Sequence, residues 1–245
     1  MPHPIHLIYL DAYHLDDPLY VPSLARMMGR LRRAVPLCLF LHGSGERAER
    51  LLEAEGRFPK KENGRVQART PQEAALVEKA LRQVNRQIVS TLTEEIIHAV
   101  GFQGTDRGLL LMDEGRDVKT GRMGWLVELI QKGAVPVLSA LVHHPETAAP
   151  YEADLTQVML AVAHALSQED VRVVFFSRRD QPGVMVDDVV LDEVALEAVP
   201  AGHLPDPIAV QAVVEAGFAA FLTSASGLFG AEIPQGTNIL RSKPA

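Results

Sequence analysis

The sequence predicts an α/β fold in which a mostly parallel central sheet is sandwiched between helices. The chain has 245 residues, of which 47% are apolar and 22% charged, so it can bury a sizeable core. Short apolar runs alternate along the chain with segments of helical spacing, which is typical of parallel βαβ units. The runs do not alternate with polar residues, as expected for strands that helices cover on both faces.

The predicted elements follow one another in a regular order. The strands are Ile5–Leu10, Pro36–Leu41, Ala99–Phe102, Val135–Leu141, Val171–Ser177 and Phe218–Thr223. The helices are Leu19–Arg33, Glu46–Glu55, Pro71–His98, Trp125–Lys132, Ala153–Ser167 and Pro207–Ala216. Thr70, Pro71 and Glu73 form a capping box with proline at the first helical position. The polar stretch Gly56–Arg69 and the segment Gly104–Gly124 are expected to form hairpins or loops.

The chain is expected to form two lobes on one continuous sheet, because a long helix ends near Ser167 and a new strand begins soon afterwards. Residues 1–167 would form the larger N-terminal lobe and residues 168–245 the smaller C-terminal lobe. The 78 residues after Ser167 are few for an independent domain.

Composition excludes several classes of partner. A net charge of −7 and an aromatic content of 5% disfavour nucleic acid. No apolar run reaches the length of about 18 residues that a membrane helix needs, and the N-terminus does not resemble a signal peptide. The single cysteine, Cys38, cannot form an intrachain disulfide, which fits a reducing, cytoplasmic setting.

A glycine turn between a predicted strand and a predicted helix is the first candidate site. Gly43, Ser44 and Gly45 can point backbone amides at an anion near a helix N-terminus, although such turns also serve packing alone. A dinucleotide fingerprint would follow the first strand rather than the second. An esterase would need a G-x-S-x-G elbow, which the sequence lacks.

Several segments together resemble acetylglutamate kinases of the amino-acid kinase family, and also the related carrier-linked aminoadipate kinases. LCLFLHGSG at Leu37–Gly45 is similar to V-V-H-G-G-G, and AVGFQGTDRG at Ala99–Gly108 to A-V-G-L-S-G-x-D-G. EADLTQVMLA at Glu152–Ala161 is similar to N-A-D-x-x-A-x-x-L-A. VFFSRRDQPGV at Val174–Val184 is similar to L-x-F-L-T-D-V-P-G-V, and Gly236–Ile239 to the closing G-T-x-I. These segments keep the family's order over nearly the whole chain.

The resemblance implies a fold, a reaction and a set of site residues. The N-terminal lobe would hold an N-acylated amino acid and the C-terminal lobe ATP with Mg²⁺. The γ-phosphoryl group would pass to a side-chain carboxylate, as in arginine or lysine biosynthesis, in a homo-oligomer such as a dimer. By resemblance, Gly43, Ser44, Gly45 and either Arg65 or Arg69 would bind a small anionic amino-acid derivative, Asp154 would organise the phosphate site, and Ser177, Arg178, Arg179 and Gly183 would bind nucleotide.

Five positions depart from the family's pattern. The first strand ends in Tyr9-Leu10-Asp11-Ala12 where the family has K-x-G-G, so Tyr9 replaces a lysine and Asp11 and Ala12 replace glycines. Asp206 stands where a second lysine is expected, and Pro150 replaces a substrate-binding asparagine. The chain has no lysine before Lys60 and none between Lys132 and Lys243.

The lysine pattern leaves two functions open. A single cation that stabilises phosphoryl transfer is worth about 10³–10⁵ in rate, and two are replaced here. One function is an acetylglutamate-kinase-like phosphotransferase with a rebuilt nucleotide site. The other is a catalytically silent relative, a pseudokinase, that binds a small ligand or regulates a partner.

Overall fold

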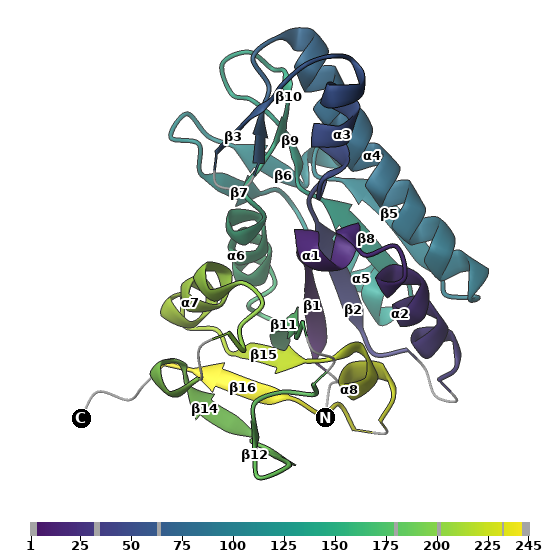
Figure 1. Cartoon of the computed structure of the whole chain (residues 1–245), viewed down its shortest axis with the longest axis vertical. Coiled ribbons are helices and arrows are strands. Elements are labelled where there is room, and N and C mark those ends of the chain that lie inside the picture. Colours follow the sequence, from purple (N-terminus) through teal and green to yellow (C-terminus); the bar gives the residue numbers. More distant parts are fainter. Residues whose placement is uncertain are drawn as a thin grey trace.

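A central sheet of eight strands organises the computed structural model, which describes residues 4–31, 35–62, 65–178, 181–199, 202–231 and 233–241. Its strands are β1 (Ile5–Leu10), β2 (Cys38–His42), β5 (Ala99–Gln103), β8 (Val135–Ser139), β11 (Val171–Phe176), β14 (Glu193–Ala195), β15 (Ala220–Thr223) and β16 (Thr237–Leu240). They lie in the order β14-β16-β15-β11-β1-β2-β8-β5 (Figure 1). All neighbouring strands are parallel except β15 and β16, which are antiparallel.

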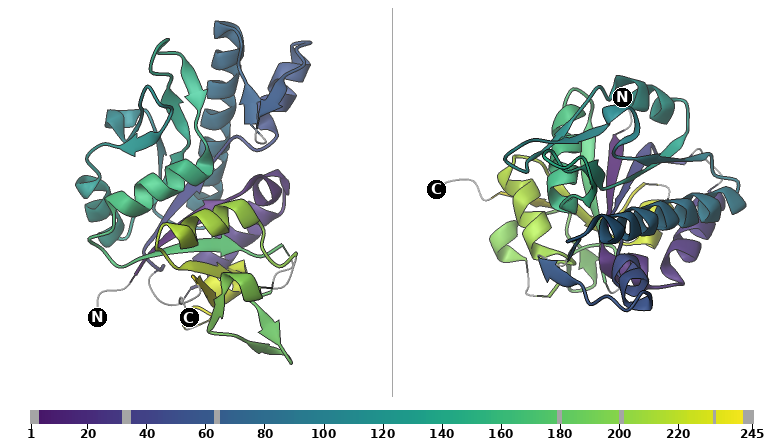
Figure 2. Two further views of the ribbon diagram at one scale, coloured as in Figure 1. Left: turned by 90° about the vertical axis from the view of Figure 1, so that its left-hand side faces the viewer. Right: turned by 90° about the horizontal axis from the view of Figure 1, so that it is seen from above.

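Helices cover both faces of the sheet, as the view from above shows (Figure 2). The helices α5 (Gly124–Gln131), α6 (Leu155–Ala165) and α7 (Pro207–Glu215) bury one face. The helices α2 (Tyr20–Gly29), α4 (Pro71–Glu94) and α8 (Ala225–Phe229) bury the other. Within β1, Leu7 and Tyr9 join the first core, whereas Ile8 and Leu10 join the second. This alternation explains why the strand is apolar throughout its length.

Short antiparallel hairpins extend the molecule beyond the main sheet. They are β3 (Lys60–Glu62) with β4 (Arg65–Gln67), β6 (Leu110–Met112) with β7 (Val118–Thr120), β9 (Leu141–His143) with β10 (Pro150–Glu152), and β12 (Met185–Val186) with β13 (Val189–Val190). The helix α3 (Arg47–Ala54) packs with the β3–β4 hairpin and α4 in a small separate cluster. The first three hairpins and α3 lie near the upper end of the molecule in Figure 1.

The fold class predicted from the sequence is confirmed, and every predicted strand and helix has a counterpart with bounds shifted by a few residues. The predicted strand Val135–Leu141 is in fact two, β8 and β9. The chain leaves the sheet at Ala140, whose amide bonds the carbonyl of His42. The short helix α1 (Ala12–Asp16), α8 and the strands β14 and β16 were not predicted. They have at most five residues each, too few for a periodic pattern.

The sheet runs without interruption from β2 in the N-terminal part of the chain to β15 in the C-terminal part, because β1 pairs with both β2 and β11. The ligand types expected for the two lobes remain a prediction. Among the described residues, no helix is long and apolar enough to cross a membrane.

Candidate functional site

A cleft of about 600 Å³ lies at the carboxyl ends of β1 and β2. In an open parallel sheet this is the edge at which ligands bind. The cleft is lined by Tyr9, Leu10, Asp11, Ala12, Leu15, Gly43, Ser44, Gly45, Arg65, Glu152, Ala153, Asp154, Leu155, Thr156, Gln157, Asp206 and Ile208. Most of the site residues predicted from the sequence therefore meet in one place.

The glycine turn has the position predicted for it, between the end of β2 and the start of α3. Gly45 has a φ of 55°, a left-handed conformation that favours glycine. His42, fully buried before the turn, lies within hydrogen-bond distance of the Gly43 carbonyl through Nδ1 (2.8 Å) and of Asn85 Nδ2 through Nε2 (3.0 Å). Burial lowers the pKa of His42 to about 4. A neutral imidazole that donates from Nδ1 and accepts at Nε2 satisfies both contacts and fixes the turn.

A buried carboxyl group, that of Glu152, accepts the hydrogen bond that the backbone amide of Ser44 in the glycine turn can donate. Ser44 donates its backbone N–H to Glu152 Oε1 and its hydroxyl to Glu152 Oε2, both at 2.7 Å. Burial raises the pKa of Glu152, and the two hydrogen bonds from Ser44 act against that rise. A Cβ atom on Gly43 would lie 2.7 Å from Glu152 Oε1, so a larger residue at that position would displace the carboxyl group. The turn thus binds a side chain of its own protein.

Tyr9 and Asp206 close one side of the cleft although they are far apart in sequence. The Tyr9 hydroxyl donates to Asp206 Oδ2 at 3.0 Å, and Asp206 Oδ1 accepts from the amide of Ala209 as the N-cap of α7. Burial, and then the charge of Asp206, raise the pKa of Tyr9 far above its usual range. Tyr9 is therefore a neutral donor whose proton is already engaged.

Asp154 and Arg65 line the same cleft. Asp154 caps α6 by accepting from the amide of Gln157, and its Oδ2 lies 3.5 Å from Arg65 Nη2. Arg65 Nη1 donates to the carbonyl of Glu152 at 3.4 Å. The Nε atom of Arg65 is buried and has no hydrogen-bond partner among the described residues. Arg65 therefore retains an unused donor.

Asp11 and Ala12 lie at the first turn after β1. Asp11 is the N-cap of α1, and its Oδ1 lies 2.9 Å from the backbone nitrogen and 2.6 Å from Nδ1 of the buried His14. The chain enters α1 here, where the family that the sequence resembles has two glycines. Asp11 is held by this local bonding and still lines the cleft.

Some predicted residues lie outside the cleft. Arg69 is exposed and does not line it, so the structure brings Arg65 but not Arg69 to this site. Pro150 begins β10, where it pairs with His143. Arg178 lines a separate hollow of about 310 Å³ together with Ser177, although its Nη2 donates to the carbonyl of Pro205, next to Asp206.

The rest of the predicted nucleotide loop is only partly described. Ser177 Oγ donates to the carbonyl of Gln181 at 2.7 Å, which folds the loop back on itself. Gly183 has a φ of 146°, and a Cβ atom there would lie 2.4 Å from Thr237 Oγ1. Arg179 lies outside the described residues. The nucleotide-binding role assigned to this loop remains a prediction.

The charge of the cleft is negative. Asp11, Glu152, Asp154 and Asp206 are its acids, and Arg65 is the one cation among the described residues that line it. Lys61 lines an adjoining hollow with Gly45 and pairs there with Glu49. This residue set does not fit the phosphates of ATP, which carry about four negative charges and need cations around them. Within the described ranges, no three His, Cys, Asp or Glu side chains are grouped so that they could hold a metal ion.

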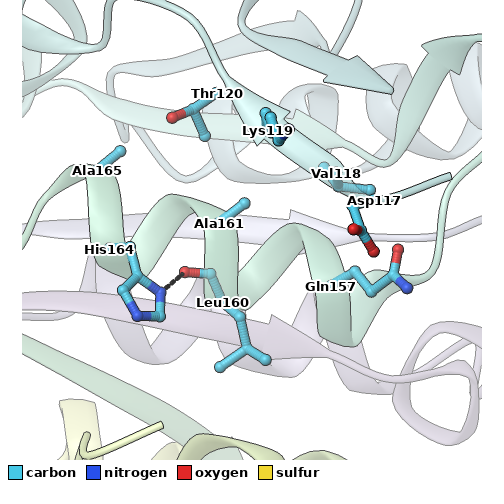
Figure 3. A pocket seen from close by; sticks show the side chains of 9 residues that line it. All are labelled: Asp117, Val118, Lys119, Thr120, Gln157, Leu160, Ala161, His164 and Ala165. Atoms are coloured by element: carbon cyan, nitrogen blue, oxygen red, sulfur yellow. Dashed lines mark hydrogen bonds between the residues drawn. The ribbon is translucent and has the colours of Figure 1, made fainter. Parts of the chain in front are cut away.

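Another hollow, of about 580 Å³, lies between the β6–β7 hairpin and α6 (Figure 3). Its side chains come from Asp117–Thr120 and from Gln157, Leu160, Ala161, His164 and Ala165. The His164 ring bonds the carbonyl of Leu160 on its own helix at 2.7 Å. None of the predicted site residues that the structure describes lines this hollow, so the cleft at β1 and β2 is the candidate site.

Comparison with known proteins gives relatives of one kind. No protein-family model matches the chain. An acetylglutamate kinase of Chloroflexus aggregans is 26% identical over 208 residues, covering 80% of this chain and 78% of the relative. One of Methanopyrus kandleri is 29% identical over 228 residues, covering 81% and 90%. One of Deinococcus radiodurans is 39% identical, but over 102 residues only.

Solved structures agree at the level of the fold. An isopentenyl phosphate kinase superposes with a TM-score of 0.63 at 17% identity, covering 96% of this chain and 99% of the other. The aspartate kinase of Synechocystis gives 0.64 at 14% identity, covering 98% of this chain and 40% of the other. The chain has the amino-acid kinase fold, and its sequence resembles acetylglutamate kinases.

Within this amino-acid kinase fold, Glu152 is a residue of the site that was not predicted from the sequence. Its segment drew attention only for its similarity to N-A-D, in which Glu152 takes the place of asparagine. An acid in place of the asparagine of an otherwise family-like motif was the available signal. His42 was likewise quoted only within the segment Leu37–Gly45, and Asn85, which contacts His42, was not predicted as a site residue.

Proposed function

We propose that this chain is a catalytically silent relative of acetylglutamate kinases, which binds a small N-acylated amino acid in the cleft without transferring phosphate. The observation that carries the proposal is the charge of the lining, four carboxyl groups against the single guanidinium of Arg65. Arg65 lines the cleft, and its guanidinium is suited to a ligand carboxylate.

Phosphoryl transfer needs positive charge around the three oxygens of the moving group. In this cleft the end of β1 supplies a neutral phenol bonded to Asp206, and the glycine turn supplies an amide bonded to Glu152. Both groups that would face a γ-phosphoryl group are thus engaged with acids of the protein itself. Two unit charges of like sign at 4 Å repel by about 1–4 kcal/mol across the range from water to a protein surface.

A phosphotransferase with a rebuilt site is the second candidate, and Lys61 favours it. This lysine shares its hollow with Gly45 and Ala12, which also line the cleft. Its pairing with Glu49 at the protein surface is a weak contact that a nucleotide can displace. Together with Arg65 it offers the positive charge that the strand ends lack.

A direct assay separates the two candidates. The protein is incubated with ATP, Mg²⁺ and N-acetylglutamate, and separately with an aminoadipate analogue, and acyl phosphate is trapped as the hydroxamate. We expect no product, while the acetylglutamate kinase of Chloroflexus aggregans, run in parallel, gives the positive control. Turnover of about 1–100 s⁻¹, as kinases show, would establish the second candidate. Lys61→Ala and Arg65→Ala would then identify the source of the charge.

Ligand binding is measured independently of turnover. Calorimetry with N-acylated amino acids is expected to show binding that Arg65→Ala weakens by about 1.5–3 kcal/mol, the worth of a charged hydrogen bond. Arg69→Ala is the matched control, because the exposed Arg69 does not line the cleft. Equal weakening by both variants, or no binding by the unmodified protein, contradicts the proposed ligand.

A further inference from the structure

The contact between Glu152 and Ser44 has the form of an occupied anion site. The carboxyl group lies against the strand–turn–helix junction where a free anion would meet backbone amides. Both of its oxygens accept from one residue, Ser44, at 2.7 Å. Glu152 and Ser44 are 7% and 4% exposed, so the pair is almost fully withdrawn from water.

The surroundings hold this carboxyl group in place. Glu152 ends β10, whose pairing with Leu141 of β9 brings it over the end of β2. Gly43 leaves room for it, since any Cβ there would lie 2.7 Å from Oε1. On the other side of the turn His42 and Asn85 form a buried pair at 3.0 Å. The turn and its acid therefore form one packed unit rather than a chance surface contact.

We propose that Glu152 is a specificity-determining residue that takes the place of a ligand's second acidic group at the Gly43–Gly45 turn. The cleft then accepts a ligand with one carboxylate, which Arg65 binds, and excludes a ligand with two or with a phosphate. This inference rests on the proposed function for its ligand, whereas its account of the turn stands alone. A dicarboxylate would have to displace Glu152 from two hydrogen bonds and lie beside its charge.

The first experiment examines the turn without any organic ligand. Inorganic phosphate is titrated into ¹⁵N-labelled protein, and the amide resonance of Ser44 is followed. In the unmodified protein we expect no saturable shift. In Glu152→Ala the amide is free, and phosphate should bind at least about tenfold more tightly. Glu152→Gln is the matched control, because it removes the charge but fills the same space, and it should gain less than Glu152→Ala.

The outcome of this titration decides the inference. A saturable Ser44 shift in the unmodified protein, or a silent Ser44 amide in Glu152→Ala, overturns it. If Glu152→Ala does not fold, Glu152→Asn serves in its place, since its shorter side chain draws back from Ser44 and retains a polar group. The titration of the unmodified protein is a test even without any variant.

The second experiment tests the ligand class with a matched pair. N-acetylglutamine and N-acetylglutamate share the same α-carboxylate and differ in the charge of the side chain. Calorimetry should show that the unmodified protein prefers N-acetylglutamine by at least about tenfold, and that Glu152→Ala loses this preference. A preference for N-acetylglutamate in the unmodified protein overturns the inference. If neither compound binds while phosphate behaves as expected, the proposed function fails and the role of Glu152 at the turn stands.

Discussion

The ends of β1 and β2 open into the same cleft, yet they satisfy their polar groups in different ways. After β1, Asp11 bonds the amide of His14, three residues further on. After β2, the amide and hydroxyl of Ser44 bond Glu152, which is 108 residues away. The N-cap residue of the following helix α3, Glu46, makes no capping bond with its own side chain, and its backbone N–H donates to Asp16, 30 residues earlier. One strand end is thus completed locally, and the other depends on a distant hairpin.

The acids of the cleft therefore fall into two groups: those that bond backbone amides a few residues away and those that bond residues distant in sequence. Asp154 and Asp206 cap α6 and α7 three residues ahead, so each of these acids belongs to its own helix. Acids at helix N-termini are stabilised by the helix dipole, whatever the function of the protein. Glu152 has no such local reason to be present. Of the acids in the cleft, Glu152 is therefore the one whose presence says most about which ligand the cleft binds.

Replacing the acids at the end of β1 and at Asp206 by glycine and lysine should change ATP affinity, and this is the largest effect we expect. Tyr9→Lys and Asp206→Lys, combined with Asp11→Gly and Ala12→Gly, remove two acids and add two cations. We expect ATP affinity to rise by at least about 100-fold, because each new charge contact near a protein surface is worth about 1–4 kcal/mol. Calorimetry with MgATP measures the gain.

The matched control keeps the volume of this quadruple variant without its positive charge. Tyr9→Met and Asp206→Gln, with the same two glycines, should bind ATP far more weakly. Equal affinity in both variants would mean that the glycines, and not the charge, admit the nucleotide. If neither variant binds ATP more tightly than the unmodified protein, the group that prevents nucleotide binding lies at the end of β2, where Glu152 is.

The elements that could be predicted from the sequence are those that depend on short-range patterns. The apolar run of β1 and the capping acids of α6 and α7 depend on neighbours within a few residues, so their elements could be located in advance. The gathering of Asp11, Asp154 and Asp206 in one cleft followed from the family resemblance. The pairing of Glu152 with Ser44 could not be predicted, because it depends on the β8–β9 break at Ala140 and on the register of Glu152 with Leu141.

The buried histidine at the β2 end should make stability depend on pH. Burial depresses the pKa of His42 to about 4, against 6.5 in the unfolded chain. Between these values the unfolded state binds the extra proton, so stability is lost as the pH falls from 6.5 towards 4. A shift of this size corresponds to about 3 kcal/mol. Urea unfolding of the protein and of His42→Gln over this range isolates the effect.

Glu152 acts in the opposite sense and has to be separated from His42. Its pKa is raised, so the folded state holds the proton more firmly, and this contribution is lost as the pH rises through the folded pKa. Comparing the protein with His42→Gln cancels the glutamate term, because both contain Glu152. An identical pH dependence in the two proteins would contradict a buried neutral imidazole.

The close approach at the glycine turn should appear as coupling between two substitutions. Gly43→Ala places a methyl group against Glu152 Oε1 and should cost about 2 kcal/mol of unfolding free energy. In the Glu152→Ala background the methyl group meets open space, and most of that cost should vanish. Chemical denaturation of the four proteins of the cycle gives the coupling energy. Additive costs would show that the carboxyl group does not press on the turn.

The smallest change in stability that we expect concerns Asp154, which lies two residues after Glu152 in the chain. Asp154 caps α6 locally, so Asp154→Ala should cost about 1 kcal/mol, and Asp154→Asn much less because asparagine also caps. Glu152→Gln keeps the shape of the side chain, so it should leave stability nearly unchanged. Because the amide carries no charge, the same substitution should alter ligand preference. Unfolding and calorimetry on the two matched pairs measure both properties. If Asp154→Asn shifts ligand preference as strongly as Glu152→Gln, the negative charge of the whole wall, and not the occupied turn, sets the specificity of the cleft.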